Sequence, residues 1–183
     1  MSVFELALII LALLVGASII WSTITVGISP MPSSRKARKA IMQLVETPGA
    51  RDAEGRKTIV DLGSGWGSLI IRMAIKYPGR HIVGYELSLT PWFVSVVIAK
   101  CLGLKNLTIY RQNFLKADLS VASVIVCYLF PAGMTALEAK LTEQKTSIRY
   151  LISNNFALPS HKPEKTIMLD DFYRSPVYRY RIH

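Results

Sequence analysis

One stretch of this chain decides its fold, and it reads Ile59-Val60-Asp61-Leu62-Gly63-Ser64-Gly65-Trp66-Gly67. A β-branched apolar run ends in an acid, and glycines then stand at alternate positions before the helix-like apolar segment 68–76. Glycine adopts backbone conformations closed to other residues, and without a Cβ it lets the chain approach a ligand closely. A helix that begins directly after such a turn points N–H groups at that ligand. The stretch therefore predicts a strand, a ligand-binding turn and a helix in succession.

The glycine spacing and Asp61 indicate what the turn binds. A dinucleotide fingerprint has the spacing G-x-G-x-x-G, whereas the spacing here is G-x-G-x-G. A buried carboxylate beside the turn would repel a pyrophosphate but attract an amine, such as the methionine half of S-adenosylmethionine. The motif resembles motif I of the class I methyltransferases. The alternative is an ordinary strand–turn–helix joint whose glycines serve packing.

The next expected strand, 82–86, ends in Glu86, whose carboxylate can accept hydrogen bonds from both ribose hydroxyls of such a cofactor. NAD-binding folds use the same device, so Glu86 supports a nucleoside ligand without choosing between the two. The preference for S-adenosylmethionine over NAD rests on Asp61 together with the alternating glycines.

Beyond this stretch, strand-like and helix-like segments alternate, which is typical of a parallel α/β sheet. We therefore expect a Rossmann-like α/β fold, mostly parallel, with an antiparallel closing hairpin. Its elements are predicted as strands at 58–62, 82–86, 107–111, 123–128 and 149–153, helices at 68–76, 91–101 and 136–144, and closing strands at 166–170 and 177–182.

The N-terminal region predicts a membrane anchor. No charged residue occurs from Leu6 to Ile28, and about 23 residues in a helix can cross the core of a bilayer. The alternatives are a cleaved signal peptide and a buried soluble helix. A basic cluster, 35–39, follows the run, and by the positive-inside rule it places the C-terminal side in the cytoplasm. We expect a single-pass transmembrane helix in the inner (cytoplasmic) membrane, with the catalytic domain on the cytoplasmic side.

The expected organisation has three parts. Residues 1–30 are the transmembrane anchor, 31–57 are a linker with an amphipathic helix, and 58–183 are the methyltransferase domain. The amphipathic helix shows a narrow apolar stripe, made of Ala37, Ala40, Ile41, Leu44 and Val45. Because the linker is short, the active site reaches only targets in or near the bilayer.

From residue 32 onward the chain resembles one branch of class I methyltransferases. The branch consists of membrane-anchored protein lysine methyltransferases that act on ATP synthase subunit c and the adenine nucleotide translocase. The resemblance rests on motif I, on Gly84-Tyr85-Glu86-Leu87 followed by Pro91-Trp92, on Gln112-Asn113-Phe114-Leu115-Lys116, and on Val126-Cys127-Tyr128-Leu129-Phe130-Pro131. The chain departs from the family where Trp66 and Ser68 replace an Asp and an Arg, and where Asn113 replaces an acid.

The resemblance implies S-adenosylmethionine as cofactor and a set of residues that bind it. Glu86 would hold the ribose, and Asn113 would meet the adenine edge. Asp61 would brace either the turn or the ammonium, and Trp66 would close over the methionine part. The residues that would surround the cofactor are Gly63, Ser64, Gly65 and Gly67. Asn113 could instead be a turn residue, and Trp66 a packing residue. Tyr128, Phe130 and Pro131 are candidates for a substrate channel, with packing at the end of a strand as the alternative. The catalytic residue stays unassigned.

Charge and composition limit the partners. The net charge of +10 favours an acidic partner, which is an anionic membrane surface, nucleic acid or an acidic patch on a protein. Nucleic acid is disfavoured, because residues 128–131 lack the Asn/Asp-Pro-Pro-aromatic element of base-amine methyltransferases. No Cys/His cluster has the spacing of a metal site. We expect a bilayer and a membrane-protein substrate as partners. A lipid, quinone or other small-molecule substrate is the alternative, as is a membrane protein that binds the cofactor without catalysis.

Overall fold

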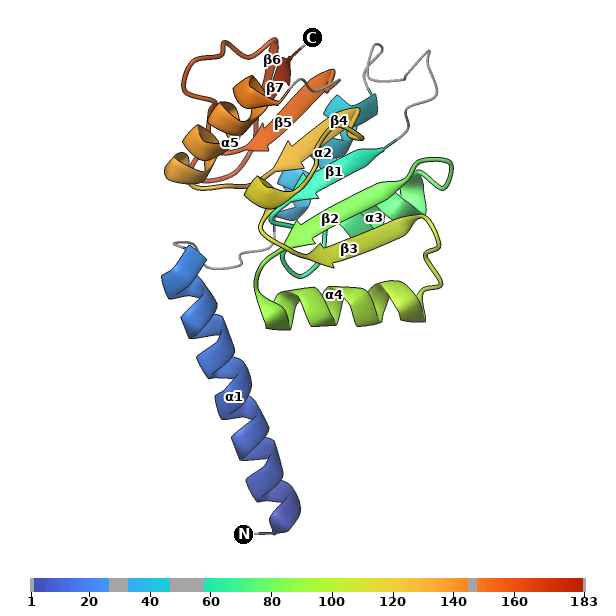
Figure 1. Ribbon diagram of the computed structural model, residues 1–183, viewed down its shortest axis with the longest axis vertical. Helices are drawn as coiled ribbons and strands as arrows, with labels where there is room; N and C mark the ends of the chain where they lie inside the picture. Colours follow the sequence, from blue (N-terminus) through green and yellow to red (C-terminus); the bar gives the residue numbers. More distant parts are fainter. Residues whose placement is uncertain (1, 27–32, 47–57, 145–147, 183) are drawn as a thin grey trace.

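The structure is a computed structural model that describes residues 2–26, 33–46, 58–144 and 148–182 (Figure 1). Within the first helix it does not describe the side chains at positions 11, 14, 18, 19 and 21–26. In this described part the helices are α1 (Val3–Val26), α2 (Arg35–Glu46), α3 (Ile70–Lys76), α4 (Leu89–Cys101), the 3-10 helix η1 (Phe114–Lys116) and α5 (Pro131–Glu143).

A single sheet organises the described part of the chain. Its seven strands lie in the order β3-β2-β1-β4-β5-β7-β6. Neighbouring strands from β3 to β5 are parallel, and β7 pairs antiparallel with both β5 and β6. The bounds are β1 (Ile59–Leu62), β2 (Ile82–Glu86), β3 (Leu107–Arg111), β4 (Val124–Cys127), β5 (Tyr150–Asn154), β6 (Lys165–Met168) and β7 (Pro176–Arg181). The Rossmann-like sheet with its antiparallel closing pair is therefore confirmed.

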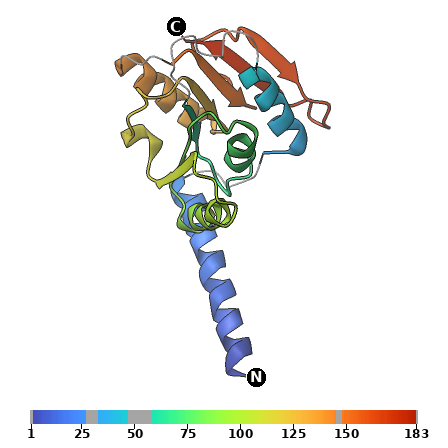
Figure 2. The same ribbon diagram turned by 90° about the vertical axis from the view of Figure 1, so that its right-hand side faces the viewer.

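Two apolar layers enclose the sheet, because successive side chains of a strand point to opposite faces. On one face, Ile59 and Ile82 pack with residues of α2 and α3. On the other face, Val60 and Val83 pack with α5 and with the segment that follows β3. Figure 2 shows α2 and α3 on one side of the sheet and α5 on the other. The central strands are covered on both faces, which is why they read as continuous apolar runs.

Several elements differ in length from the expected ranges. Helix α4 begins at Leu89 rather than Pro91, so Leu89 and Thr90 form its first turn. Helix α5 begins at Pro131 rather than Ala136, because proline suits the first turn of a helix. In α2 the expected stripe is buried as predicted. The division of the chain into 1–30, 31–57 and 58–183 stays a prediction.

The predicted N-terminal helix is present as α1, which is 24 residues long and extends away from the sheet (Figure 1). A helix that crosses a bilayer needs about 20 consecutive, predominantly apolar residues. Among the residues that the structure describes, no helix meets that requirement of length and apolar character. The expected transmembrane span is therefore not supported, although the helix itself is.

Candidate functional site

The site lies where the order of the strands reverses. From β1 the chain moves outward to β2 and β3, and it then returns to β4 on the other side of β1. In open α/β sheets, ligands bind at the carboxyl ends of the strands at such a switch point. A cavity of about 300 Å³ opens here. Its lining comes from the residues that follow β1, β2, β3 and β4.

The turn after β1 is built from glycines with left-handed backbone. Gly63, Gly65 and Gly67 have φ angles of 75°, 53° and 76°. The amides of Gly63 and Ser64 donate to the carbonyl of Tyr85 at 2.9 and 3.0 Å, which fixes the turn on β2. Gly63 and Gly65 line the cavity. At these two glycines the turn therefore presents backbone, rather than side chains, to a ligand.

Gly67 stands where helix α4 packs closely on the turn. A Cβ at this position would lie 2.8 Å from the Cβ of Ser95 in α4 and 3.0 Å from Ile71 Cδ1. Gly67 is buried and does not line the cavity. The structure thus places this glycine at a close helix contact, and its predicted place beside the cofactor stays a prediction.

Two buried carboxylates stand at the cavity. Asp61 and Glu86 are 5% and 7% exposed. Burial, and next the neighbouring charge of Glu86, raise the pKa of Asp61 to about 7. Glu86 Oε2 accepts a hydrogen bond from the amide of Gly65 at 2.7 Å, and its Oε1 accepts one from the amide of Ser88 at 2.7 Å. Each oxygen of Glu86 keeps a second lone pair for a hydroxyl donor.

The cavity fits the polar, amine-bearing cofactor that motif I implies. Ser64 Oγ is buried without a hydrogen-bond partner in the structure, and Ser64 lines the cavity. A Cβ built on Gly65 meets no atom within 4 Å, so this side of the turn faces open space. An unpartnered hydroxyl beside two carboxylates is a cradle for a ligand that carries both donors and acceptors.

Asn113 and Trp66 line the same cavity. The Asn113 side-chain oxygen accepts a hydrogen bond from the amide of Leu115 at 2.9 Å, which caps η1. The turn function considered for Asn113 is therefore real, and contact of its amide with an adenine stays a prediction. Trp66 is half-buried, so its placement is compatible with both interpretations.

The candidate channel residues separate into two groups. Tyr128 and Phe130, which follow β4, line the cavity, whereas Pro131 is exposed, begins α5 and is not among the lining residues, although Ala132 beside it is. A place for Pro131 in a substrate channel stays a prediction. The ring of Tyr128 stacks on Phe156 with centroids 6.2 Å apart, so the loop after β5 supports this aromatic wall.

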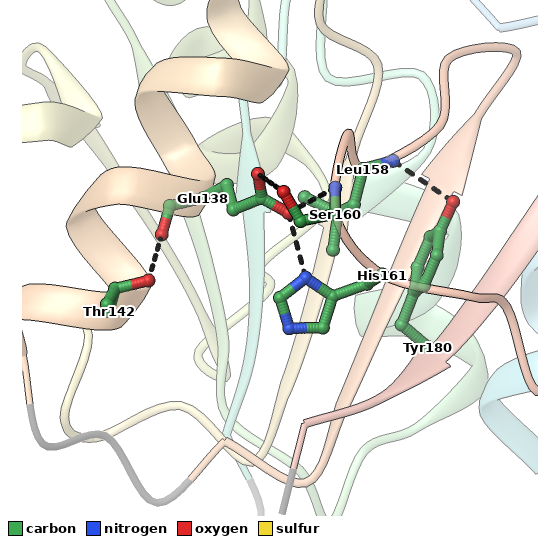
Figure 3. A network of polar contacts seen from close by, with 6 residues as sticks. All are labelled: Glu138, Thr142, Leu158, Ser160, His161 and Tyr180. Carbon is green, nitrogen blue, oxygen red and sulfur yellow. Dashed lines mark hydrogen bonds and ion pairs between the residues drawn. The ribbon is translucent and has the colours of Figure 1, made fainter.

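The loop after β5 is itself fixed to α5 (Figure 3). Glu138 Oε1 accepts hydrogen bonds from the amide of Ser160 at 3.0 Å and from His161 Nδ1 at 2.8 Å, and Glu138 Oε2 accepts one from Ser160 Oγ at 3.2 Å. Further along, Tyr180 accepts a hydrogen bond from the amide of Leu158 at 3.0 Å. The serine hydroxyl bonds the carboxylate rather than the imidazole, so this cluster is a structural tether and not a nucleophile with its base.

Sequence reasoning missed part of the cavity. Ser33 and Ile41 reach it from the helix α2 region, and no local signal marks them, since tertiary packing alone brings them there. Phe114 and Leu115 also line it, and the aromatic residue before a lysine in 112–116 was the signal that could have found them. No lysine, arginine or histidine lines the cavity within the described part of the chain.

Burial makes Cys127 chemically inert. Burial is the main cause that raises the pKa of its thiol to about 12. Its Sγ lies 3.8 Å from the sulfur of Met134. The thiol stays protonated at neutral pH, and it serves packing rather than nucleophilic catalysis.

The strand order, the glycine turn after β1 and the paired carboxylates at the switch point define a class I, S-adenosylmethionine-dependent methyltransferase. Comparison with known families agrees: the chain belongs to the family of the ANTKMT methyltransferase domain, which matches residues 61–165. S-adenosylmethionine is therefore its cofactor. No curated protein matches the chain.

Solved structures share the fold. An RNA methyltransferase from Salinibacter ruber, solved with S-adenosyl-L-homocysteine, is 25% identical with a TM-score of 0.71, and the match covers 83% of this chain and 94% of that chain. Magnesium protoporphyrin IX methyltransferase from Synechocystis, also solved with S-adenosyl-L-homocysteine, is 16% identical with a TM-score of 0.59, over 79% of this chain and 80% of that chain. The second likeness shows the fold alone.

Proposed function

We propose that this methyltransferase modifies an amine, namely a lysine side chain of a membrane protein. The observation that carries the proposal is the composition of the cavity. Its outer wall is aromatic, with Tyr128 and Phe130, and its charged groups are the carboxylates of Asp61 and Glu86. A cationic acceptor is attracted to an aromatic wall, and no basic side chain lines the cavity in the described part of the chain to bind the phosphates of a nucleic acid.

The cofactor would be held by the residues that surround the glycine turn. Glu86 would accept from the ribose hydroxyls, Asp61 would face the amine of the methionine part, and the hydroxyl of Ser64 would gain its missing partner. When bound, the cofactor supplies an activated methyl group on a sulfonium. The protein then contributes position and electrostatics rather than covalent chemistry.

A lysine must lose its proton before it can accept a methyl group. The aromatic and apolar wall favours the neutral amine, because burial lowers the pKa of a lysine. The nitrogen lone pair then forms the new C–N bond as the C–S bond breaks, and the electron pair of the broken bond stays on sulfur. The one proton released overall is the one that the lysine lost to water before the transfer, and the methylammonium product keeps its remaining protons at neutral pH. No general base on this chain is required by this sequence of events.

Membrane attachment through α1 completes the proposal. Large apolar side chains on successive positions of α1 are strongly exposed, including Val3 at 87%, Phe4 at 71% and Leu13 at 68%. Exposed apolar side chains of this kind are stable in contact with lipid or with another apolar surface. The basic residues at the start of α2 would lie on the anionic, cytoplasmic surface of the inner membrane.

A lipid or quinone substrate is the second candidate. The exposed apolar surface of α1 brings a membrane-soluble acceptor to the cavity as readily as a membrane protein. RNA is a third acceptor to test, because the similar structure from Salinibacter ruber is an RNA methyltransferase.

One fractionation experiment separates these substrates. Membranes and total RNA are incubated with the full-length enzyme and S-adenosylmethionine that carries a radioactive methyl group. We expect label in the protein fraction, recovered as methyllysine after acid hydrolysis. Label confined to the lipid fraction or to RNA would overturn the lysine proposal and name the actual acceptor.

A matched pair of variants controls this assay. Gly65→Arg puts a long side chain into the cavity, and we expect it to abolish cofactor binding in calorimetry together with the label. Gly103→Arg introduces the same residue at a glycine that also has left-handed backbone and open space at its Cβ, but away from the cavity. If both variants lost cofactor binding equally, backbone strain rather than the cavity would explain the loss.

A further inference from the structure

Helix α4 packs on the sheet, but several of its large apolar side chains are exposed on the side that faces away from the sheet. Its buried residues are small or polar, namely Pro91, Ser95 and Ala99. Leu89, Phe93 and Val97 recur every four residues on the opposite side and are 49%, 58% and 41% exposed. A helix that serves only to cover a sheet shows the reverse arrangement.

The residues on the inner side of α4 already have hydrogen-bond and packing partners within the domain. Ser95 is fully buried, and its Oγ donates to the carbonyl of Trp92 at 2.7 Å. The Ser95 Cβ would be 2.8 Å from a Cβ on Gly67, so small residues here permit close packing on the cofactor turn. Close packing therefore explains the small residues on the inner side of α4. The large apolar residues on its outer side need a different explanation.

The position of α4 suggests what covers its outer side. Helix α4 packs on β3, at the edge of the sheet, and α1 lies against α4. Both views show α1 leaving the domain on the side where α4 lies (Figures 1 and 2). The exposed Lys100 follows the stripe by one turn, and a lysine beside apolar residues suits the anionic interface of a bilayer.

We propose that the outer side of α4, formed by Leu89, Phe93 and Val97, docks on the lipid bilayer. The inference rests on the proposed membrane attachment through α1, and it adds the orientation of the domain. A protein partner is less well matched, because a stable interface buries about 1,200 Å² or more and three side chains on one helix provide only part of that. Helix α1, which carries the proposed membrane attachment, also lies against α4.

Docking of α4 would bring the mouth of the cavity to the membrane surface. Leu87 lines the cavity, is 45% exposed and is two residues before the first residue of α4. With α4 at the interface, an acceptor side chain could enter the cavity past Leu87 directly from the bilayer. The orientation thus links the anchor to the substrate.

A probe on the native Cys101 tests the inference. Cys101 is exposed at the end of α4, whereas Cys127 is buried, so a thiol-reactive NBD fluorophore labels the former selectively. Full-length labelled protein is mixed with anionic vesicles that contain lipids with a spin-label quencher near the headgroup. We expect a blue shift of the emission and strong quenching. In Phe93→Ser/Val97→Ser protein we expect both effects to be lost, while S-adenosylhomocysteine binding in calorimetry is unchanged.

Controls separate the two proposals. Flotation of the same samples on a density gradient reports attachment through α1, so a protein that does not float contradicts the proposed attachment. A protein that floats while the Cys101 probe stays in water overturns the docking of α4. A blue shift that appears without vesicles and grows with protein concentration would also overturn the docking of α4 on lipid. It would indicate that a second copy of the chain covers the outer side of α4. The same probe attached at position 162, in a Cys101→Ser/Lys162→Cys variant, is expected to stay unquenched.

Discussion

At the scale of single residues, Asp61 has the most consequences for function. It is buried at the end of β1 beside Glu86, and its pKa is raised to about 7, first by burial and next by that neighbour. A positively charged group in the cavity would stabilise the ionised form. Ligand binding and proton release at Asp61 are therefore coupled.

We expect the affinity for S-adenosylmethionine to rise with pH up to about 7 and then to level off, because the carboxylate must be ionised to attract the amine. Asp61→Asn should bind at least about tenfold more weakly above neutral pH, which corresponds to about 1.4 kcal/mol of a charged hydrogen bond. Its affinity should also lose most of the pH dependence. Calorimetry between about pH 5.5 and pH 8.5 checks both. Equal pH profiles for the two proteins would exclude Asp61 as the titrating group.

Gly84 on β2 supports the cofactor turn from behind. A Cβ at this position would lie 2.8 Å from Ile70 Cδ1 and 2.9 Å from Ser64 Oγ. We expect Gly84→Ala to lower the free energy of unfolding by about 1–3 kcal/mol through overpacking and to weaken cofactor binding by displacing Ser64. Chemical denaturation and calorimetry measure the two effects. Gly79→Ala, where the added Cβ meets nothing within 4 Å, should change neither.

The site could be predicted from the sequence as far as its signals are local. Asp61, the first two glycines of the turn and Glu86 were placed correctly at the cavity, because each sits at the end of a strand whose period is clear. Gly67 lies at a helix contact and Pro131 begins a helix, and neither is among the residues that line the cavity. A glycine needed for helix contact looks the same in sequence as one needed for a ligand, and a proline that starts a helix looks like the end of a strand. Whether the correctly placed residues bind the cofactor as expected stays a prediction.

At the scale of elements, the tether between α5 and the loop after β5 governs the aromatic wall. Burial raises the pKa of Glu138, but the hydrogen bonds from His161 and Ser160 outweigh this, so its pKa is lowered overall. A lowered carboxyl pKa stabilises the fold above the ordinary pKa of about 4 and loses that contribution as the pH falls through the folded value.

We expect Glu138→Ala to accelerate hydrogen exchange at residues 158–162 and to lower the free energy of unfolding by only about 1 kcal/mol, since the partners are partly exposed. Mass spectrometry of exchanged peptides gives the measurement. Thr142→Val removes a hydrogen bond within α5 alone, to the carbonyl of Glu138 (Figure 3), and should leave the loop unchanged. Unchanged exchange in the Glu138 variant would show that the tether does not hold the loop.

Element bounds were predicted well where apolar periodicity was continuous and less well where it was interrupted. Strands β2 and β3 fall on the expected residues. Helix α5 begins five residues before its expected start, at a proline that suits the first turn of a helix. In the fold Gly133 is buried, and a Cβ there would be 3.2 Å from Leu129 Cβ. That contact joins residues four apart along the chain, and its closeness shows only once the helix is formed.

At the scale of the whole molecule, the raised pKa of Asp61 sets a pH dependence of stability. Between about pH 4, where an unfolded Asp titrates, and about pH 7, the folded state binds more protons than the unfolded state. The contribution of Asp61 to the free energy of unfolding therefore falls as the pH rises through this window and is constant above it.

We expect Asp61→Asn to gain stability relative to the natural protein as the pH rises from about 4 to about 7. Urea denaturation without cofactor, at several pH values, measures the difference. A difference that stays constant across the window would mean that Asp61 is ionised throughout. Because each comparison is made at one pH, the titration of the other acids cancels.

The whole fold was predictable because alternating strands and helices allow few arrangements, and the glycine turn fixes which strand carries the site. The N-terminal region was less predictable, because hydropathy predicts a helix but does not by itself determine how that helix meets a bilayer.

The short link from Leu87 to α4 has a kinetic consequence. If α4 docks on the bilayer as proposed, the cavity mouth is held at the membrane plane, and enzyme and acceptor would meet by lateral diffusion in two dimensions. Confinement to this thin layer raises the effective concentration of the acceptor without any new contact. Turnover would then follow the number of acceptors per unit of membrane area, and dilution of the sample at constant lipid-to-protein ratio would leave the rate of each enzyme unchanged.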